Sequence, residues 1–265
     1  MRLRTVIGLA IAVVWVALTG CVSQRSDSGS GLKPSNSTMG DEAPDRLRAR
    51  VHTELASSYF ELGNIPVALE ETKEALRADA NYGPAHNIMG LLYATLKEDR
   101  LAEESFRRAL QLNPLDSDAN HNYGQFLCQR KREDEGIGHF LAAVKNPLYQ
   151  GPDRSYTNAG VCARRRGDMA AAEGYFQMAL KTRPSQPQAL YNMAEISYTR
   201  GDFAGARGYL ARLTKVSQPN AEVLWLGVRV ERRLGDRNSE ASYAAQLRNS
   251  FPDSKEARAL ASGEN

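Results

Sequence analysis

The chain has 265 residues, of which 42% are hydrophobic, 8% aromatic and 25% charged. This composition is typical of a globular protein and excludes a polytopic membrane protein, a collagen-like chain and a disulfide-dense mini-protein, since three cysteines allow one bridge at most. The 34 Lys and Arg residues against 31 Asp and Glu leave a formal net charge of +3, which argues against a dedicated nucleic-acid binder with a concentrated basic face.

Residues 1–20 have the parts of a secretory signal peptide. Arg2 and Arg4 form a short basic start, and residues 6–18 form an uncharged apolar run. A helix of that length rises only about 20 Å, which is too short for a bilayer core of roughly 30 Å. The segment Leu18-Thr19-Gly20-Cys21 is similar to the bacterial lipobox, in which signal peptidase II cuts before the cysteine. We therefore predict a lipoprotein signal peptide, with an ordinary signal peptide and an incidental cysteine as the alternative.

The lipobox resemblance implies that Cys21 becomes the first residue of the mature chain and carries a diacylglycerol and an N-acyl chain. Two or more acyl chains hold a protein stably on a membrane, at about 0.8 kcal/mol per buried CH₂. Because the next residue is Val22 rather than Asp, the sorting convention of such lipoproteins implies the outer membrane, on its periplasmic face.

Residues 21–44 join this expected anchor to the rest of the chain. They are rich in Ser, Gly, Asn and Asp and contain few apolar side chains. Such a segment buries too little apolar surface to offset its ordering entropy, so we predict a disordered tether. A flexible linker of this length has an r.m.s. span of roughly 25–30 Å, which lets a folded domain stand off the membrane surface.

The remainder of the chain repeats one unit about every 34 residues. Each unit resembles the tetratricopeptide repeat, in which two antiparallel helices touch at small residues. At the eighth position of the unit the small residues are Ala56, Gly90, Gly124, Gly160 and Ala194. The expected repeats are 49–82, 83–116, 117–150, 153–186, 187–220 and 221–254. The sequence thus predicts an all-α fold, a right-handed superhelical solenoid of about six repeats in a domain over residues 45–262.

The sixth unit departs from the repeat pattern. Val228 and Glu240 occupy the two positions that should carry small residues. Terminal repeats are often atypical because one of their faces meets solvent or a cap rather than another repeat. We expect residues 255–262 to supply part of that cap.

The sequence offers no motif for catalysis, metal binding or cofactor binding: it contains no HExxH, no Walker loop and no Gly-x-Ser-x-Gly. His52 and His86 occupy a position where the repeat usually buries an aromatic residue, so we interpret them as packing residues rather than metal ligands. Basic runs such as 130–132 and 164–166 fall near the ends of first helices, where cations complement the helix dipole. We therefore expect no enzyme activity, cofactor or metal, and neither nucleic acid nor a small molecule as ligand.

What remains is a binding surface. Stacked repeats place their first helices along a concave surface, and the side chains at particular positions of each unit face the groove that this surface forms. In the first two and last two units these positions carry Phe60, Asn87, Leu91, Ala94, Tyr191, Glu195, Tyr198, Trp225 and Arg229. Tyr, Trp and Arg dominate interface hot spots, so we predict a partner-binding groove, with half-buried wall packing as the alternative for each ring. Capture of a helix and capture of an extended peptide both remain open.

Cys128 and Cys162 lie on the first helices of adjacent units, at the twelfth and tenth positions. Two positions correspond to about 200° around a helix, so the thiols lie on nearly opposite sides and either face each other across the interface or point away. An oxidising periplasm favours a bridge if the sulfurs meet. The alternatives are a Cys128–Cys162 disulfide and two buried free thiols.

The middle units carry a more specific resemblance. The segments Asn120–Cys128, Asn146–Tyr149 and Asn158–Cys162 are similar to the type IV pilus biogenesis/stability lipoproteins, the pilotin family of the PilF and PilW kind. The similarity covers essentially the whole chain. It implies an outer-membrane lipoprotein that helps the secretin pore of the pilus machine reach that membrane or multimerise in it. The alternative is a tetratricopeptide lipoprotein adaptor for peptidoglycan enzymes or for outer-membrane protein assembly.

Overall fold

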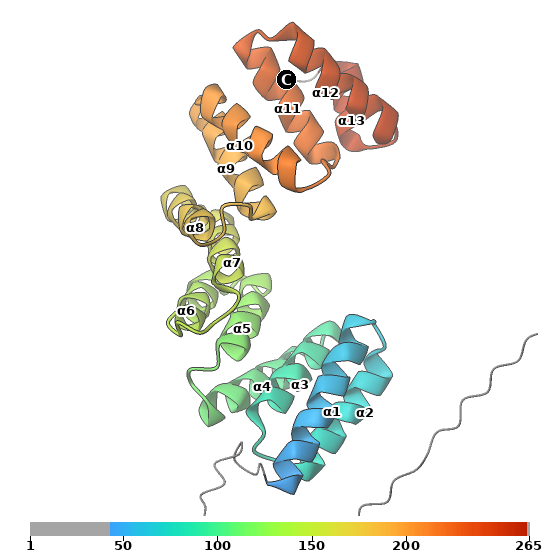
Figure 1. Ribbon diagram of the computed structural model, residues 1–265, viewed down its shortest axis with the longest axis vertical. Helices are drawn as coiled ribbons and strands as arrows, with labels where there is room; N and C mark the ends of the chain where they lie inside the picture. The colour runs from blue at the N-terminus through green and yellow to red at the C-terminus, as the bar shows by residue number, and fades with distance from the viewer. Residues whose placement is uncertain (1–42, 264–265) are drawn as a thin grey trace, which may run out of the picture. The chain divides into compact units, whose positions relative to one another are not determined.

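The computed structural model describes residues 43–263, and every regular element in this range is an α-helix (Figure 1). The helices are α1 (Pro44–Glu61), α2 (Ile65–Ala78), α3 (Gly83–Thr95), α4 (Asp99–Leu112), α5 (Ser117–Gln129), α6 (Glu133–Ala143), α7 (Pro152–Arg165), α8 (Met169–Thr182), α9 (Pro187–Arg200), α10 (Phe203–Val216), α11 (Ala221–Leu234), α12 (Arg237–Ser250) and α13 (Lys255–Ser262). The predicted signal peptide, the lipidation site Cys21 and the tether up to residue 42 lie outside the described residues. Within residues 43–263, no helix has the length and apolarity needed to cross a bilayer.

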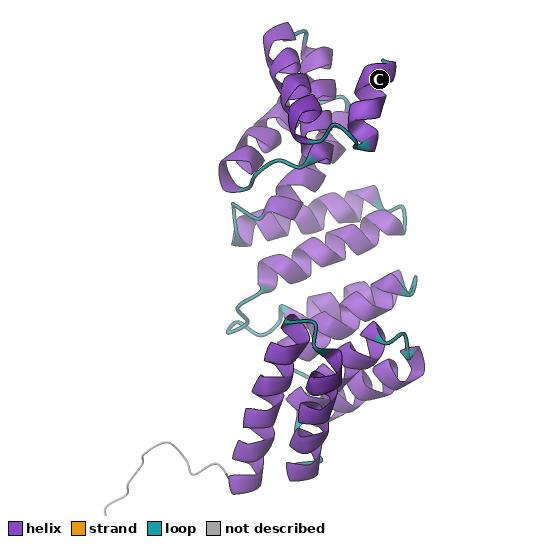
Figure 2. Ribbon diagram, turned by 90° about the vertical axis from the view of Figure 1, so that its right-hand side faces the viewer, coloured by secondary structure: helices purple, strands orange, loops and turns teal. Residues whose placement is uncertain are grey.

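Successive helices pack as hairpins, one hairpin per repeat (Figure 2). α1 packs on α2, α3 on α4, and the series continues to α11 on α12. First helices of neighbouring repeats also touch, as α1 touches α3 and α3 touches α5. The short α13 packs against α11 and α12. These stacked helical hairpins confirm the predicted all-α tetratricopeptide solenoid. In such a fold each repeat buries its apolar side against its neighbour.

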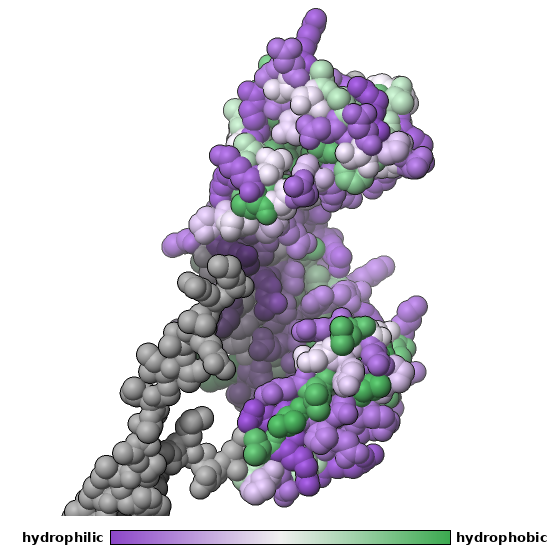
Figure 3. All heavy atoms as spheres, turned by 45° about the vertical axis from the view of Figure 1, so that its right-hand side comes forward, coloured by the Kyte–Doolittle hydropathy of each residue, from purple (hydrophilic) through white to green (hydrophobic). Residues whose placement is uncertain are grey.

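The first helix begins earlier than the repeat period suggests. α1 begins at Pro44, which the sequence had placed at the end of the tether, and so extends upstream of residue 49. Proline suits the first turn of a helix, since its missing N–H has no intrahelical partner there. Leu47, Val51 and Leu55 follow at four-residue intervals on α1 and are 43%, 43% and 41% exposed. They line one face of the helix, and Figure 3 shows a band of hydrophobic residues over the N-terminal repeats.

Side-chain caps and left-handed residues set the helix boundaries. Asp168, for example, accepts the backbone N–H of Ala171 at the start of α8 at 2.9 Å. Glycines in the left-handed region follow four of the first helices: Gly63, Gly167, Gly201 and Gly235. In the second and third repeats, which lack this glycine, Lys97 (φ 62°) and Lys131 (φ 61°) adopt the same conformation. A side chain with a Cβ takes up this conformation only at a cost in free energy.

Close approach of the two helices of a repeat explains the glycines at the eighth position. A Cβ on Gly160 in α7 would lie 2.6 Å from the Phe176 ring in α8, and Gly90 has the same relation to Phe106. Both phenylalanines are fully buried. The core of these repeats is therefore a phenylalanine of the second helix packed onto a glycine of the first.

The sixth repeat makes its close contact one residue earlier than the sequence suggests. A Cβ on Gly227 would lie 2.8 Å from the Tyr243 ring. Val228, at the expected position, is fully buried, and the half-buried Glu240 pairs with Arg232 at 2.8 Å. The sixth repeat therefore keeps a contact between a glycine and an aromatic ring, at a position that the repeat register does not predict.

Candidate functional site

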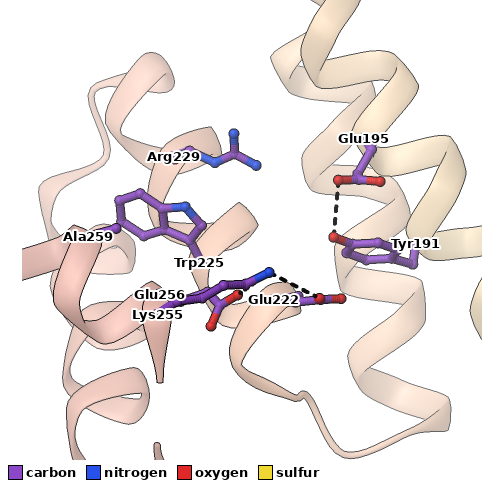
Figure 4. Close-up of a pocket in the computed structure, with 8 residues that line it drawn as sticks. All are labelled: Tyr191, Glu195, Glu222, Trp225, Arg229, Lys255, Glu256 and Ala259. Atoms are coloured by element: carbon purple, nitrogen blue, oxygen red, sulfur yellow. Dashed lines mark hydrogen bonds and ion pairs between the residues drawn. The ribbon is translucent and has the colours of Figure 1, made fainter. Parts of the chain in front are cut away.

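Four of the five groove residues predicted in the last two repeats line one pocket of about 380 Å³; the fifth, Tyr198, does not. α9 presents Tyr191 and Glu195 toward Trp225 and Arg229 of α11 (Figure 4). The other lining residues are Glu222, Lys255, Glu256 and Ala259. A second pocket of about 480 Å³ adjoins the first, since Tyr191 and Glu222 line both. We call these two adjoining pockets the C-terminal groove.

Arg229 lies against two aromatic rings at the edge of this groove. Its Cζ atom is 4.7 Å from the centroid of the Tyr198 ring and 5.9 Å from that of the Trp225 ring. Ring faces attract a guanidinium group, so the two rings hold the cation in place. Trp225 reaches the pocket because its neighbour Leu224 takes the buried position, as predicted. Tyr198 packs beneath Arg229 and against Phe203, which is the wall-packing alternative.

A hydrogen-bonded set of side chains forms the opposite wall. The Tyr191 hydroxyl donates to Glu195 at 3.1 Å, and Arg164 from α7 donates to the same carboxylate at 2.6 Å. Burial raises the pKa of Tyr191, and the charge of Glu195 and the hydrogen bond to it raise it further. Tyr191 therefore stays a neutral donor, and Glu195 is occupied by its own neighbours.

The predicted residues of the first two repeats gather separately. Phe60 of α1 and Asn87 and Leu91 of α3 line a pocket of about 540 Å³. Phe60 and Leu91 also line a neighbouring pocket of about 360 Å³, together with Ala94. Asn87 is buried and accepts a hydrogen bond from Asn122 of α5 at 3.1 Å. We call these two pockets the N-terminal groove; the sequence-predicted residues thus form two groups that line different pockets.

Sequence reasoning missed part of both grooves. Glu222, Lys255 and Glu256 line the C-terminal groove, but the last two belong to the capping helix α13, to which no repeat position applies. Gln125 lines the N-terminal groove from the third repeat. It stands at the ninth position of its unit, as Leu91 does in the second, so applying the same rule to the third unit would have found it.

A buried polar network joins the third and fourth repeats. His121 of α5 shares a hydrogen bond with the Ser155 hydroxyl of α7 at 2.8 Å, and Ser155 lies 3.3 Å from the Tyr149 hydroxyl. Burial and the charge of Arg154 lower the pKa of His121 to about 4, so this ring is neutral at neutral pH. A serine beside a histidine suggests a nucleophile, but Ser155 is 0% exposed and no substrate reaches it. The pair therefore stabilises the repeat interface.

The same interface carries a disulfide. Cys128 of α5 and Cys162 of α7 are bonded, with their Cα atoms 5.8 Å apart. Both side chains are buried. The sequence left open a disulfide or two buried free thiols, and the structure contains the disulfide.

His52 and His86 are half-buried rather than packed in the core as predicted. The half-buried His52 pairs with Glu71, with its Nδ1 2.7 Å from Oε2, and the Nε2 of the half-buried His86 lies 3.0 Å from the carbonyl oxygen of Ala80. These rings make polar contacts at the surface rather than filling an aromatic position in the core. In the part of the chain that the structure describes, no cluster of three or more His, Cys, Asp or Glu side chains could hold a metal ion.

Comparison with known proteins assigns the chain to a family. The tetratricopeptide repeat model matches residues 90–155, 148–189 and 157–222. The chain is 31% identical over 194 residues to the type IV pilus assembly protein PilF of Pseudomonas aeruginosa. This alignment covers 73% of each protein. A solved PilF structure from this species aligns with a TM-score of 0.77 at 28% identity, covering 83% of this chain and 99% of that one. The structure of PilW, a widely conserved type IV pilus biogenesis factor, aligns with a TM-score of 0.71 at 30% identity over 80% and 97% of the two chains. The chain therefore belongs to the family of tetratricopeptide-repeat proteins of type IV pilus biogenesis that includes PilF and PilW.

Proposed function

We propose that this chain is a lipid-anchored scaffold of the outer membrane that binds the type IV pilus secretin and promotes its localisation or multimerisation. The observation that carries the proposal is the extent of the match. The alignments take in 99% of the solved PilF chain and 97% of the solved PilW chain, so the whole repeat domain is shared rather than one or two repeats.

The repeat domain would act by binding rather than by chemistry. Its two grooves present aromatic, amide and charged side chains, which suit recognition of a polypeptide. Held on the membrane through Cys21, the domain would raise the local concentration of unassembled secretin subunits. Concentration at the site of assembly then favours ring formation without a catalytic step.

The second part of the proposal is that acyl chains on Cys21 anchor the domain to the outer membrane. The lipobox-like Leu18–Cys21 segment supports acylation at Cys21, and Val22 supports sorting to the outer membrane. Without acyl chains the domain would be diluted into the periplasm, and the gain in local concentration would be lost.

The test is the amount of detergent-resistant secretin multimer in outer membranes, with and without this gene. Loss of multimer while secretin monomer persists is the expected result, and the wild-type gene should restore multimer. A Cys21→Ser variant expressed at the same level should restore much less, because it lacks the anchor. Full assembly with Cys21→Ser would contradict the tethering step. Unchanged multimer without the gene would contradict the secretin proposal and favour an adaptor for peptidoglycan enzymes or outer-membrane protein assembly.

A further inference from the structure

The charges of the C-terminal groove are not balanced in the free protein. Its three carboxylates all have partners: Glu195 is bonded to Arg164 at 2.6 Å, and Glu222 and Glu256 lie 3.9 Å and 3.5 Å from the Lys255 ammonium. Among residues 43–263, no carboxylate pairs with the groove residues Arg165 and Arg229. One ammonium, that of Lys255, serves both Glu222 and Glu256. The groove as a whole has four cations against three carboxylates, and Arg165 and Arg229 are the two cations to which no carboxylate of the described residues is paired.

Of these two cations, Arg229 is held in the more fixed position for binding an anion. Arg165 is exposed, whereas the Arg229 guanidinium is held over the Tyr198 and Trp225 rings. Its Nε atom is buried and makes no hydrogen bond. A cation whose position is fixed by packing loses little side-chain entropy when it binds an anion, and a guanidinium presents a planar fork that fits a carboxylate.

The adjoining pocket adds an unsatisfied acceptor. Asn192 of α9 is 2% exposed and lines this pocket, and its Nδ2 donates to the carbonyl oxygen of Gln188 at 2.7 Å. Its Oδ1 is buried without a donor. A turn about the Cβ–Cγ bond toward the pocket, which exchanges the Nδ2 hydrogen bond to Gln188 for one to the ligand, would let this oxygen accept a main-chain N–H of a ligand. A helix bonds all but its first four N–H groups internally, whereas an extended chain offers N–H groups along its length, so an extended chain suits this residue better.

We propose that the C-terminal groove binds an extended peptide segment of a partner protein, with an Asp or Glu side chain of that segment paired to Arg229. The peptide backbone runs past Asn192, and the Tyr191 and Trp225 rings flank the acidic side chain. The inference rests on the proposed role of the repeat domain as a protein-binding scaffold, and it names the chemistry of the segment that one end of the domain recognises. The pairing is a charge-assisted hydrogen bond in a partly desolvated site.

The test is selection from a phage library of random short peptides on the full chain in detergent micelles. Wild-type protein should enrich peptides with an Asp or Glu at one fixed position. Arg229→Gln should lose this preference, and Arg229→Lys, which keeps the charge, should retain it. Arg237→Gln removes an exposed arginine outside the groove and should select as wild type does. Enrichment of no peptide, enrichment without an acidic position, or an unchanged preference with Arg229→Gln would overturn the inference.

A double-mutant cycle with the best selected peptide gives the second readout. Replacing its acidic residue by the amide should weaken binding to wild-type protein about tenfold, as should Arg229→Gln with the acidic peptide. Combining the two changes should cost no more than either alone. If Arg229→Gln does not fold, the amide peptide on wild-type protein and on Arg229→Lys still decides the question, because equal affinity for acid and amide contradicts the pairing. A library contains no secretin, so a failure here leaves the proposed function standing, and a failure of the multimer assay leaves the peptide result unchanged.

Discussion

Cys128 of α5 and Cys162 of α7 are joined by a disulfide, 34 residues apart in sequence, that fastens the third repeat to the fourth. The hydrogen bond between His121 and Ser155 crosses the same pair of helices. Elsewhere in the described residues, neighbouring repeats are joined by packing, hydrogen bonds and ion pairs alone. The interface in the middle of the domain is therefore the one reinforced covalently, and the N-terminal groove reaches it, since His121 of α5 and Arg154 of α7 line that groove.

The disulfide should contribute about 2–4 kcal/mol to the free energy of unfolding, because it lowers the conformational entropy of the unfolded chain. We expect the protein to have an intact mass lower by two hydrogens before reduction, and urea unfolding to shift to lower urea when reductant is added. A Cys128→Ala, Cys162→Ala variant is the control, since its unfolding should not respond to reductant. A wild-type protein whose mass and unfolding are both insensitive to reductant would show that the bridge does not form.

The left-handed lysines are a source of strain that glycine should relieve. Lys97 and Lys131 occupy the turn position that glycine fills in four other repeats. Replacing either lysine by glycine should raise the free energy of unfolding by about 0.5–1 kcal/mol, because the Cβ penalty exceeds the entropy that glycine adds to the unfolded chain. Gly167→Ala, the reverse change at the matching position of the fourth repeat, should lower it. Urea denaturation measures all three, and a loss of stability with both lysine changes would refute the strain argument.

The contact between Gly160 and Phe176 should tolerate no extra methyl group. Gly160→Ala places a Cβ 2.6 Å from the ring, so either the ring or the helix must move, at a cost of about 1–3 kcal/mol in thermal or urea unfolding. Gly174→Ala, in the exposed middle of α8 with nothing within 4 Å of its Cβ, is the matched control. It should stabilise by about 0.5–1 kcal/mol through helix propensity. Equal effects of the two alanines would mean that the helices do not approach closely at residue 160.

Burial of His121 should make the domain sensitive to mild acid. The pKa of His121 falls from 6.5 to about 4 in the folded chain, so between these values the unfolded chain binds more protons. The free energy of unfolding should therefore be fully developed above pH 6.5 and fall as the pH drops to about 4, by about 3 kcal/mol at most from this residue. His121→Gln, which cannot titrate, should show a smaller fall.

The comparison of these two proteins isolates His121 from other titrating groups. The pKa of His139 is also lowered by burial, and the pKa of Asp118 is raised by burial and by Asp116, so both shape the profile of each protein. Urea denaturation between pH 7.5 and pH 4.5 measures the difference. Parallel profiles for the wild type and His121→Gln would contradict the assigned protonation state.

The repeat period predicts much of the domain because it reports on packing that recurs. Small residues must stand where helices touch, so Gly90 and Gly160 mark the seam from sequence alone. Trp225 and Arg229 were found as groove residues for the same reason, since they occupy first-helix positions that face a neighbouring repeat.

Features that belong to one repeat only were not predictable in this way. Lys255 and Glu256 reach the C-terminal groove from α13, where the period has ended. Gly227 rather than Val228 makes the close contact in the sixth repeat, which packs against the short α13 instead of a further repeat. The left-handed conformation of Lys97 could not be predicted from its residue type, since the neighbouring helices impose that conformation.

The most direct test of the account asks whether secretin touches the grooves in cells. A photo-crosslinking amino acid is placed at Leu91 in the N-terminal groove, at Trp225 in the C-terminal groove, or at Met178, which is 40% exposed on the second helix of the fourth repeat. We predict a covalent adduct with secretin from at least one groove position and none from Met178. No secretin adduct from either groove position, or equal adducts from Met178, would contradict the claim that this protein binds secretin through the first-helix face of its repeats.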